Sequence, residues 1–143
     1  MIRASVVTSP ILVDRLVAEV ADATNGATAA FVGTVRSTNE GREVSGIEYS
    51  AYRSMAEREM TAILSEAVRA YDVSGVVIEH RVGVLAVGDV SIAAVAAAPH
   101  RRAAIDAMSA IVEETKKRAP IWKLEHYVDG TREWVGASSE ASA

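Results

Sequence analysis

The sequence of 143 residues contains no cysteine, which excludes disulfide bonds, thiolate metal ligands and a thiol nucleophile within this chain. It has no excess of basic residues either. With a formal net charge of −4, a broad nucleic-acid-binding surface is not expected. No apolar run reaches the roughly 18 residues that a membrane-spanning helix needs, and residues 1–5 lack the layout of a signal peptide. We therefore expect a cytoplasmic, globular protein that does not bind nucleic acid or membrane.

The length predicts one domain, residues 1–136, followed by a frayed tail of small and polar residues, 137–143. Strand and helix patterns alternate, but the glycine-rich turn of a dinucleotide-binding fold is missing. The late strands resemble hairpins, with Asp129-Gly130 as one turn. These patterns favour an α+β fold, with a mostly antiparallel sheet and helices packed on one side.

The expected elements follow from hydrophobic spacing and turn residues. Ser9-Pro10 predicts the cap and first turn of the first helix, Gly33 predicts a bulge, and residues 37–43 predict a mobile loop. The third helix is expected to bury Ile105 with later apolar residues. The strands are expected at 2–8, 27–36, 44–52, 75–87 with a break at Gly83, 90–98, 121–128 and 131–135, and the later helices at 54–71 and 100–118.

A cationic stretch surrounds the break at Pro120, between the third helix and the next strand. Lys116 and Lys123 flank this break and could face one pocket. Neighbouring cations and partial burial lower the pKa of a lysine, which can then act as a general acid, a general base or a nucleophile. Cations at a helix C-terminus also simply stabilise the helix dipole. That second interpretation is preferred for Lys117 and Arg118 and stays open for Lys116.

The strand after the break alternates, so Trp122 and Lys123 point to opposite faces. Glu125 shares the face of Lys123, and an ion pair between the two is expected.

A second cationic group, His100-Arg101-Arg102, opens the third helix. Cations oppose the dipole at a helix N-terminus, so their presence there indicates a bound anion such as phosphate. The alternative is a solvated helix start, with Arg102 pointing to water. Arg36, at the end of an apolar strand, is a candidate phosphate or carboxylate ligand.

His100 and Lys116 are 16 positions apart, or roughly 24 Å along one helix. One copy of the chain cannot bring both to the same small substrate, so we predict a homodimer with shared sites. The three histidines are scattered without a helical pair or matched carboxylates, and no metal site is expected.

Five motifs in order give the sequence a resemblance to a known family. They are Phe31 to Arg36, Glu48 to Glu57, His80 to Gly83, His100-Arg101, and Lys116 to Glu125. Together they resemble the catalytic (large) subunit of molybdopterin synthase, the MoaE family, over roughly residues 5–135.

The resemblance implies an α/β hammerhead-type fold and a homodimer that binds a small ubiquitin-like sulfur-carrier subunit (MoaD-like) at each end, as a heterotetramer. The carrier's C-terminal Gly-Gly thiocarboxylate would supply two sulfurs in turn to cyclic pyranopterin monophosphate, forming the dithiolene of molybdopterin. No cofactor is implied.

The resemblance also implies roles for individual residues. Lys116 and Lys123 match the catalytic lysines, while Arg36, and His100 and Arg101 from the neighbouring copy, match substrate-pocket residues. The supporting residues are Phe31, Trp122 and Glu125.

The sequence departs from the family's pattern in two places. Ile105 replaces an aromatic residue, and Pro99 precedes His100. Two other functions remain as alternatives. One is a binding module for a phosphorylated metabolite or peptide tail, and the other is a structural partner whose cations only solvate its surface.

Overall fold

The computed structural model describes residues 1–135, and this part contains three helices and nine strands. No helix in the described part is long and apolar enough to cross a membrane. In chain order the elements are β1 (Ile2–Val7), α1 (Val13–Glu19), β2 (Ala27–Thr34), β3 (Thr38–Asn39), β4 (Arg42–Ala51), α2 (Arg53–Ala70), β5 (Gly75–Arg81), β6 (Gly83–Ala86), β7 (Val90–Ala98), α3 (Arg101–Arg118), β8 (Ile121–Tyr127) and β9 (Arg132–Val135).

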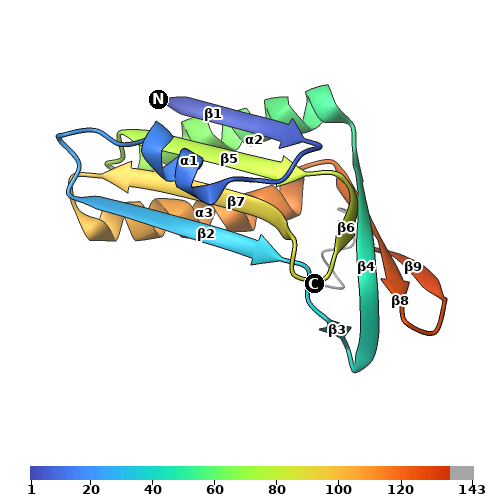
Figure 1. The fold of residues 1–143 in the computed structure, drawn as a ribbon. Coiled ribbons are helices and arrows are strands. Elements are labelled where there is room, and N and C mark those ends of the chain that lie inside the picture. Colours follow the sequence, from blue (N-terminus) through green and yellow to red (C-terminus); the bar gives the residue numbers. More distant parts are fainter. Residues whose placement is uncertain (136–143) are drawn as a thin grey trace.

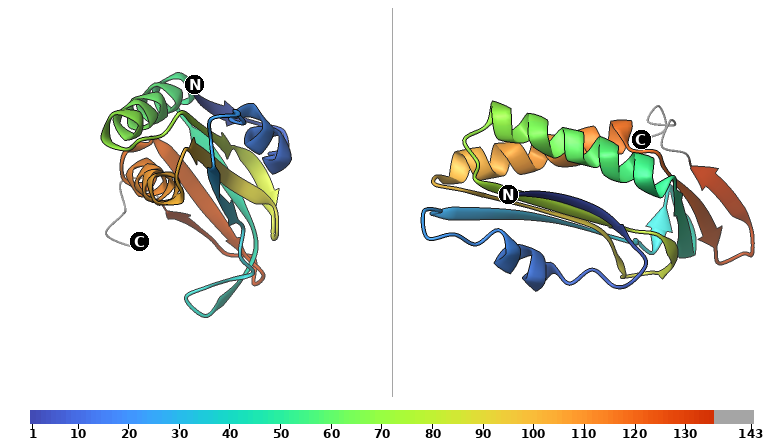
Figure 2. Two further views of the ribbon diagram at one scale, coloured as in Figure 1. Left: turned by 90° about the vertical axis from the view of Figure 1, so that its left-hand side faces the viewer. Right: turned by 90° about the horizontal axis from the view of Figure 1, so that it is seen from above.

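The main sheet has four strands in the order β1-β5-β7-β2. Only β1 and β5 are parallel, and the other pairs are antiparallel. Helices α2 and α3 lie side by side on one face, and α1 packs against the other face (Figures 1 and 2). The α+β class is thus confirmed, with α1 as the one helix of the described part that lies on the opposite side.

Strand β7 is buried on both faces, because every second side chain points to the opposite side of a strand. Ala94, Ala96 and Ala98 face α2 and α3, whereas Ala93, Val95 and Ala97 face α1. Alanine leaves room for helices to approach the sheet closely. The alanine-rich sequence of β7 therefore suits a central strand covered on both sides.

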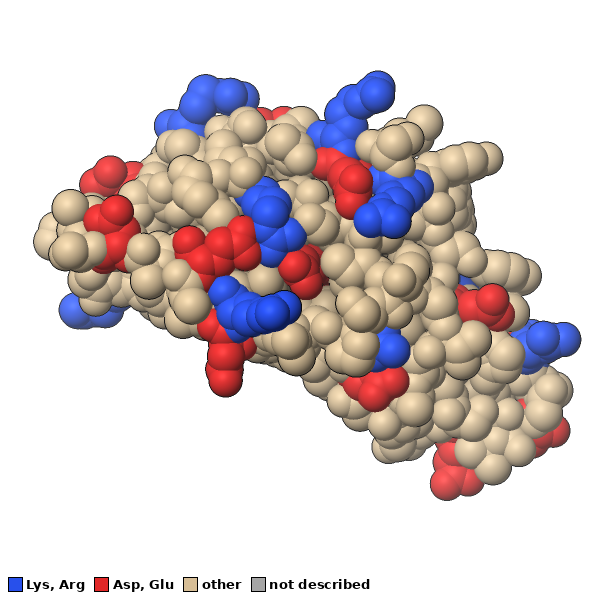
Figure 3. Space-filling model, turned by 45° about the horizontal axis from the view of Figure 1, so that its top comes forward, with Lys and Arg blue, Asp and Glu red and all other residues tan. Residues whose placement is uncertain are grey.

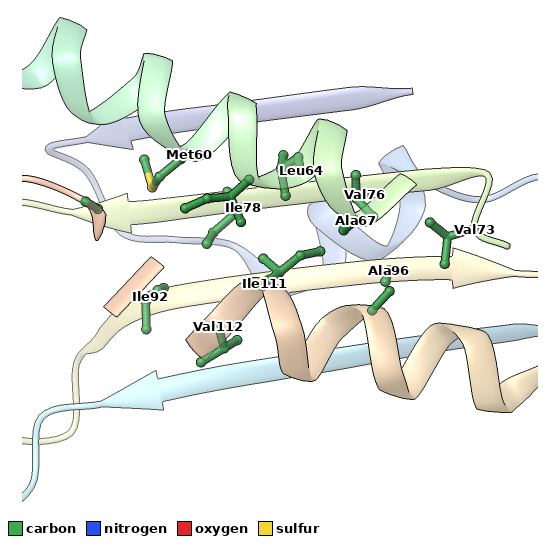
Figure 4. Close-up of a cluster of buried hydrophobic side chains, with 14 of the residues drawn as sticks. Met60, Leu64, Ala67, Val73, Val76, Ile78, Ile92, Ala96, Ile111 and Val112 are labelled. Carbon is green, nitrogen blue, oxygen red and sulfur yellow. The ribbon is translucent and has the colours of Figure 1, made fainter. Parts of the chain in front are cut away.

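Helices α2 and α3 form the larger core with this sheet. Met60, Leu64 and Ala67 recur at helical spacing on α2 and point toward the sheet, as does Ile111 on α3 (Figure 4). Burial of these side chains fixes α3 along the sheet, which determines where both of its ends lie.

A second sheet, of five strands, covers the end of the molecule where α3 finishes (Figure 1). Its strands have the order β3-β4-β8-β9, and β6 also pairs with β4. A small separate core beneath it contains Val35, Val44, Ile47, Leu85 and Tyr127.

Two expectations near helix and loop boundaries were wrong. α1 begins at Val13 with Leu12 as its N-cap, so Ser9-Pro10 precedes the helix rather than capping it. Residues 37–43 are not an open loop, because β3 and β4 form a hairpin around Glu40-Gly41, whose φ angles are 50° and 80°. Positive φ at both positions is what a two-residue hairpin turn requires, and glycine accepts it without strain.

The expected bulge at Gly33 is confirmed by a register shift between Gly33 and Thr34. A Cβ atom at Gly33 would lie 2.6 Å from Cγ2 of Ile92, so the neighbouring strand approaches too closely for a side chain. Ile105 was wrongly placed in the core, since its side chain is 45% exposed. The inner face of α3 instead follows Ala104, Ala107 and Ile111.

The division into one domain and a tail stays a prediction. The tail, residues 137–143, lies outside the described residues.

Candidate active site

Helix α3 separates two groups of cations by its whole length. His100 is the N-cap residue in an extended conformation, Arg101 is the first helical residue, and Lys116 lies in the last turn. A rise of about 1.5 Å per residue places His100 and Lys116 roughly 24 Å apart. The structure therefore keeps the two halves of the predicted site at opposite ends of one chain.

Arg36 and Lys123 lie at the same end as Lys116. Both α3 and β2 run antiparallel to β7, so their C-terminal ends point the same way (Figure 1). Arg36 follows β2 directly, and β8, which carries Lys123, begins beside the end of α3. The structure thus brings Arg36, Lys116 and Lys123 to one end and leaves His100 and Arg101 at the other.

Several neighbouring cations are neutralised by carboxylates. Lys117 lies 3.9 Å from Glu114, and Arg118 binds Glu59 and Glu66 at 2.8 and 2.7 Å. These are structural contacts, and they support the simpler interpretation of Lys117 and Arg118.

Arg102 is likewise 3.7 Å from Asp106. Its side chain is 80% exposed, so Arg102 points to water, as the interpretation of a solvated helix start held for this residue.

The predicted site residues differ from these neighbours. Within residues 1–135, none of them makes an ion pair with a carboxylate. Of these five residues, Lys123 is half-buried, whereas the other four are exposed, namely Arg36, His100, Arg101 and Lys116. Cations without internal partners are available to hold an anion.

One face of the molecule carries both signs of charge. On the face shown in Figure 3, basic and acidic side chains are interspersed. Arg15, Arg58, Arg69 and Arg132 also make no ion pair within residues 1–135, so what distinguishes the end of α3 is that Arg36, Lys116 and Lys123 gather there.

Glu125 does not pair with Lys123, and that expectation was wrong. Its side chain is only 3% exposed, and its Oε1 accepts hydrogen bonds from Nδ2 of Asn39 at 2.7 Å and from the hydroxyl of Tyr127 at 2.9 Å. Glu125 therefore connects β8 with the β3–β4 hairpin. Asn39 was missed from the sequence because only the folded hairpin brings it to Glu125, whereas Tyr127 lies two residues further along β8, where strand alternation could have indicated it.

The two aromatic supporting residues pack against neighbouring elements. Trp122 is half-buried and meets Tyr52 edge-on, with ring centroids 5.5 Å apart. Phe31 is half-buried on β2 and packs against the larger core. Their positions explain how β8 and β2 are held, and they bring no polar group to the site.

His80 has a structural role, as its strand position indicated. Burial lowers its pKa to about 4, so it stays neutral at pH 7. Its Nδ1 lies 2.9 Å from the carbonyl oxygen of Arg81, and its ring meets Tyr49 edge-on. Among residues 1–135, no group of three His, Asp or Glu side chains is arranged to hold a metal ion.

Two surface hollows lie away from these cations. One of about 440 Å³ is lined by Arg3, Arg15 and Glu79 among others, and one of about 180 Å³ lies between α2 and α3. Neither is lined by a predicted site residue. Neither hollow is therefore the pocket that was expected around Lys123.

Comparison with solved structures defines the class of protein. A molybdopterin synthase structure from Staphylococcus aureus superimposes with a TM-score of 0.88 at 31% identity, covering 92% of this chain and 96% of that one. The MoaE protein of Burkholderia ambifaria gives 0.83 at 32% identity, covering 99% and 95%. The fold is thus that of the molybdopterin biosynthesis proteins.

Within this class, the model of the MoaE protein family matches residues 6–118, and the chain belongs to that family. A molybdopterin synthase catalytic subunit from Bacillus subtilis is 33% identical over all of this chain and 90% of its own length. One from Aspergillus fumigatus is 41% identical over 76% of this chain and 58% of its own length. The chain thus spans about 58 to 60% of the length of the fungal and rice relatives, and 90% of the length of the Bacillus subtilis relative.

Proposed function

We propose that this chain is the catalytic subunit of a molybdopterin synthase that acts in the cytoplasm. Its reaction is the transfer of sulfur from the thiocarboxylated C-terminus of a small carrier subunit to cyclic pyranopterin monophosphate, forming a dithiolene. One observation carries the proposal: in a member of the MoaE family, Arg36, Lys116 and Lys123 gather at one end of the molecule without carboxylate partners in residues 1–135.

Each residue has a role that follows from its charge. Arg36, with His100 and Arg101 of a second copy, holds the cyclic phosphate. Lys116 promotes attack by the thiocarboxylate through proton transfer or charge stabilisation, and Lys123 stabilises developing negative charge or the carrier's tail. The chain itself has no cysteine, so its sulfur must arrive on another molecule. No resident cofactor or metal is needed for these roles.

The second copy is part of the proposal because α3 holds His100 and Lys116 too far apart for one small substrate. We infer that two copies meet so that the start of α3 in one lies near the end of α3 in the other. With one carrier at each end, this homodimer becomes a heterotetramer.

Strand β2 offers an edge for this contact. It is the last strand of the main sheet, its sequence Ala27–Thr34 carries no charge, and no described strand covers its outer side. Long uncharged edges of this kind favour pairing with another strand. Antiparallel pairing of two β2 strands places Gly26 of one copy near Arg36 of the other. Gly26 donates its N–H to the carbonyl of Ala98, just before α3, so the start of α3 in one copy also lies near Arg36 of the other copy.

The absence of cysteine makes this edge directly testable. Single cysteines are introduced at successive positions of β2, starting with Ala30→Cys at its middle, and oxidised. Paired β2 strands predict efficient cross-linking near one position and a decline on either side of it, read on non-reducing gels. Equal, weak cross-linking along the whole strand would contradict this interface.

Reconstitution tests the catalytic proposal. The chain is mixed with a thiocarboxylated carrier and cyclic pyranopterin monophosphate, and dithiolene formation is followed. Product is expected only with the thiocarboxylated form of the carrier. Tight binding of the pterin without product would instead favour the alternative, a binding module for a phosphorylated metabolite.

A further inference from the structure

The carboxylate of Glu125 is buried, yet no lysine or arginine pairs with it within residues 1–135. Its hydrogen-bond partners within residues 1–135 are neutral donors, the side-chain amide of Asn39 and the hydroxyl of Tyr127, and both donate to Oε1. Hydrogen bonds to a charged acceptor are stronger than neutral ones, and a buried charge that loses a donor is costly. The Asn39 amide therefore carries more weight than a surface asparagine would.

This hydrogen bond joins the two segments that carry site cations. Arg36 lies just before the β3–β4 hairpin, which is closed by the N–H of Val44 donating to the carbonyl of Ser37 at 2.8 Å. Lys123 lies two residues before Glu125 on β8. The Asn39–Glu125 contact thus fixes the Arg36 segment against the strand of Lys123.

The outer side of the hairpin is held independently. The guanidinium of Arg42 lies 3.5 Å from the centre of the Tyr127 ring and donates hydrogen bonds to Thr131 and Glu133 at 2.6 and 3.2 Å. The hairpin therefore remains folded when the inner contact is removed. Because β4 stays paired with β8 from Val44 to Ala51, what changes is the placement of the β3 arm and of Arg36 just before it.

We propose that Asn39 is a positioning residue of the site: through Glu125 it sets the placement of Arg36 relative to Lys123. The inference rests on the proposed function for its catalytic readout, and on the hydrogen bond itself for its structural readout.

The tyrosines around Glu125 do not titrate in the pH range of the test, so a pH-dependent change in a variant can be assigned to its carboxyl groups. Burial raises the pKa of Tyr127, as does its hydrogen bond to Glu125, and burial raises the pKa of Tyr49. Both hydroxyls therefore stay protonated between pH 5 and 8. Lys123 lies two residues before Glu125 on the same face of β8, and Glu133 lies opposite Glu125 on β9, in contact with Arg42. Asn39→Asp adds a second carboxyl group of nearly the same shape beside Glu125.

The test compares Asn39→Ala, Asn39→Asp and the matched control Thr38→Ala, an exposed neighbour on the same strand. At pH 7.5 both Asn39 variants are expected to raise the KM for the pterin about tenfold relative to the wild type, with kcat changed less than about threefold. Below about pH 6, Asn39→Asp is expected to recover, because one proton shared by two close carboxyl groups restores a donor. Asn39→Ala does not recover, and Thr38→Ala keeps the wild-type KM at every pH.

Amide hydrogen exchange across residues 36–44 separates this inference from the proposed function, because it needs no activity. Relative to the wild type at the same pH, Asn39→Asp is expected to exchange faster at pH 7.5 and to regain protection at pH 5.5. A wild-type chain that forms no product would refute the proposed function and leave this result standing. Equal protection in all four proteins, or a wild-type KM in both Asn39 variants, overturns the positioning role.

Discussion

Lys116 and Lys117 are neighbours with different surroundings. Lys117 lies near Glu114, whereas Lys116 has no carboxylate partner in the described part of the chain. Lys116→Ala is expected to lower product formation at least about 100-fold, since it removes a group that stabilises charge in the reaction. Lys117→Ala, the matched control, is expected to keep activity within about twofold of the wild type. Near-normal turnover by Lys116→Ala in the reconstituted assay would remove Lys116 from the mechanism.

His80 gives the fold a dependence on pH. Its pKa is lowered by burial to about 4 in the folded chain, against about 6.5 when unfolded. Between these values the unfolded state binds more protons, so stability is full above about pH 6.5 and is lost as the pH falls toward 4. The loss attributable to His80 is about 2 kcal/mol at pH 5.

His80→Gln removes this titration. The difference in unfolding free energy between pH 7.5 and pH 5, measured with denaturant, is expected to be about 2 kcal/mol smaller in the variant than in the wild type. An unchanged difference would show that His80 takes up a proton in the folded state.

At the scale of elements, α2 owes its place to a few side chains directed at the sheet. Leu64 is fully buried, and Leu64→Ala is expected to cost about 2–4 kcal/mol of unfolding free energy through lost burial and a residual cavity. Leu12→Ala, at a leucine that is 52% exposed, is expected to change it by less than about 0.5 kcal/mol. Denaturant unfolding of both variants provides the comparison, and similar losses would contradict the assignment of Leu64 to the core.

Elements with strong local patterns could be predicted from the sequence. The helical spacing on α2 and the break at Pro120 gave the later helices to within one residue, and Asp129-Gly130 marked the β8–β9 turn. α1 was predicted to start too early, because a serine and a proline can also form an extended approach to a helix. Ile105 was misplaced because one residue rotates a helix face by about 100°.

Candidate site residues could be named from the sequence, and their roles stay predictions, whereas their contacts could not be foreseen. A lysine at a helix end and an arginine after a strand can be recognised in the sequence, and the cluster at the end of α3 contains both. The partner of Glu125 was not, since Asn39 is 86 positions away and reaches it only after a hairpin has formed. Long-range contacts of single side chains leave no periodic signal in a sequence.

At the scale of the whole molecule, the separated cations make a prediction about mixtures. Lys116→Ala and Arg101→Ala chains are each expected to be inactive, because every site in such homodimers lacks one essential group. Mixed dimers contain one site with both defects and one site with none. After unfolding and refolding together, an equal mixture is expected to regain about a quarter of wild-type product formation. A mixture as inactive as its parents would show that each site is built from a single copy.

Helix α3 has 18 residues and reaches from one predicted site to the other in the proposed dimer. The length of α3 then determines the spacing of the two reaction centres. An extra turn inserted into α3 would displace one set of cations by about 5 Å without altering any residue that touches the substrate. Evolution of this chain can therefore vary the exposed residues of α3 between the two groups of cations, while insertions and deletions within the helix are tolerated only if β2 changes in step.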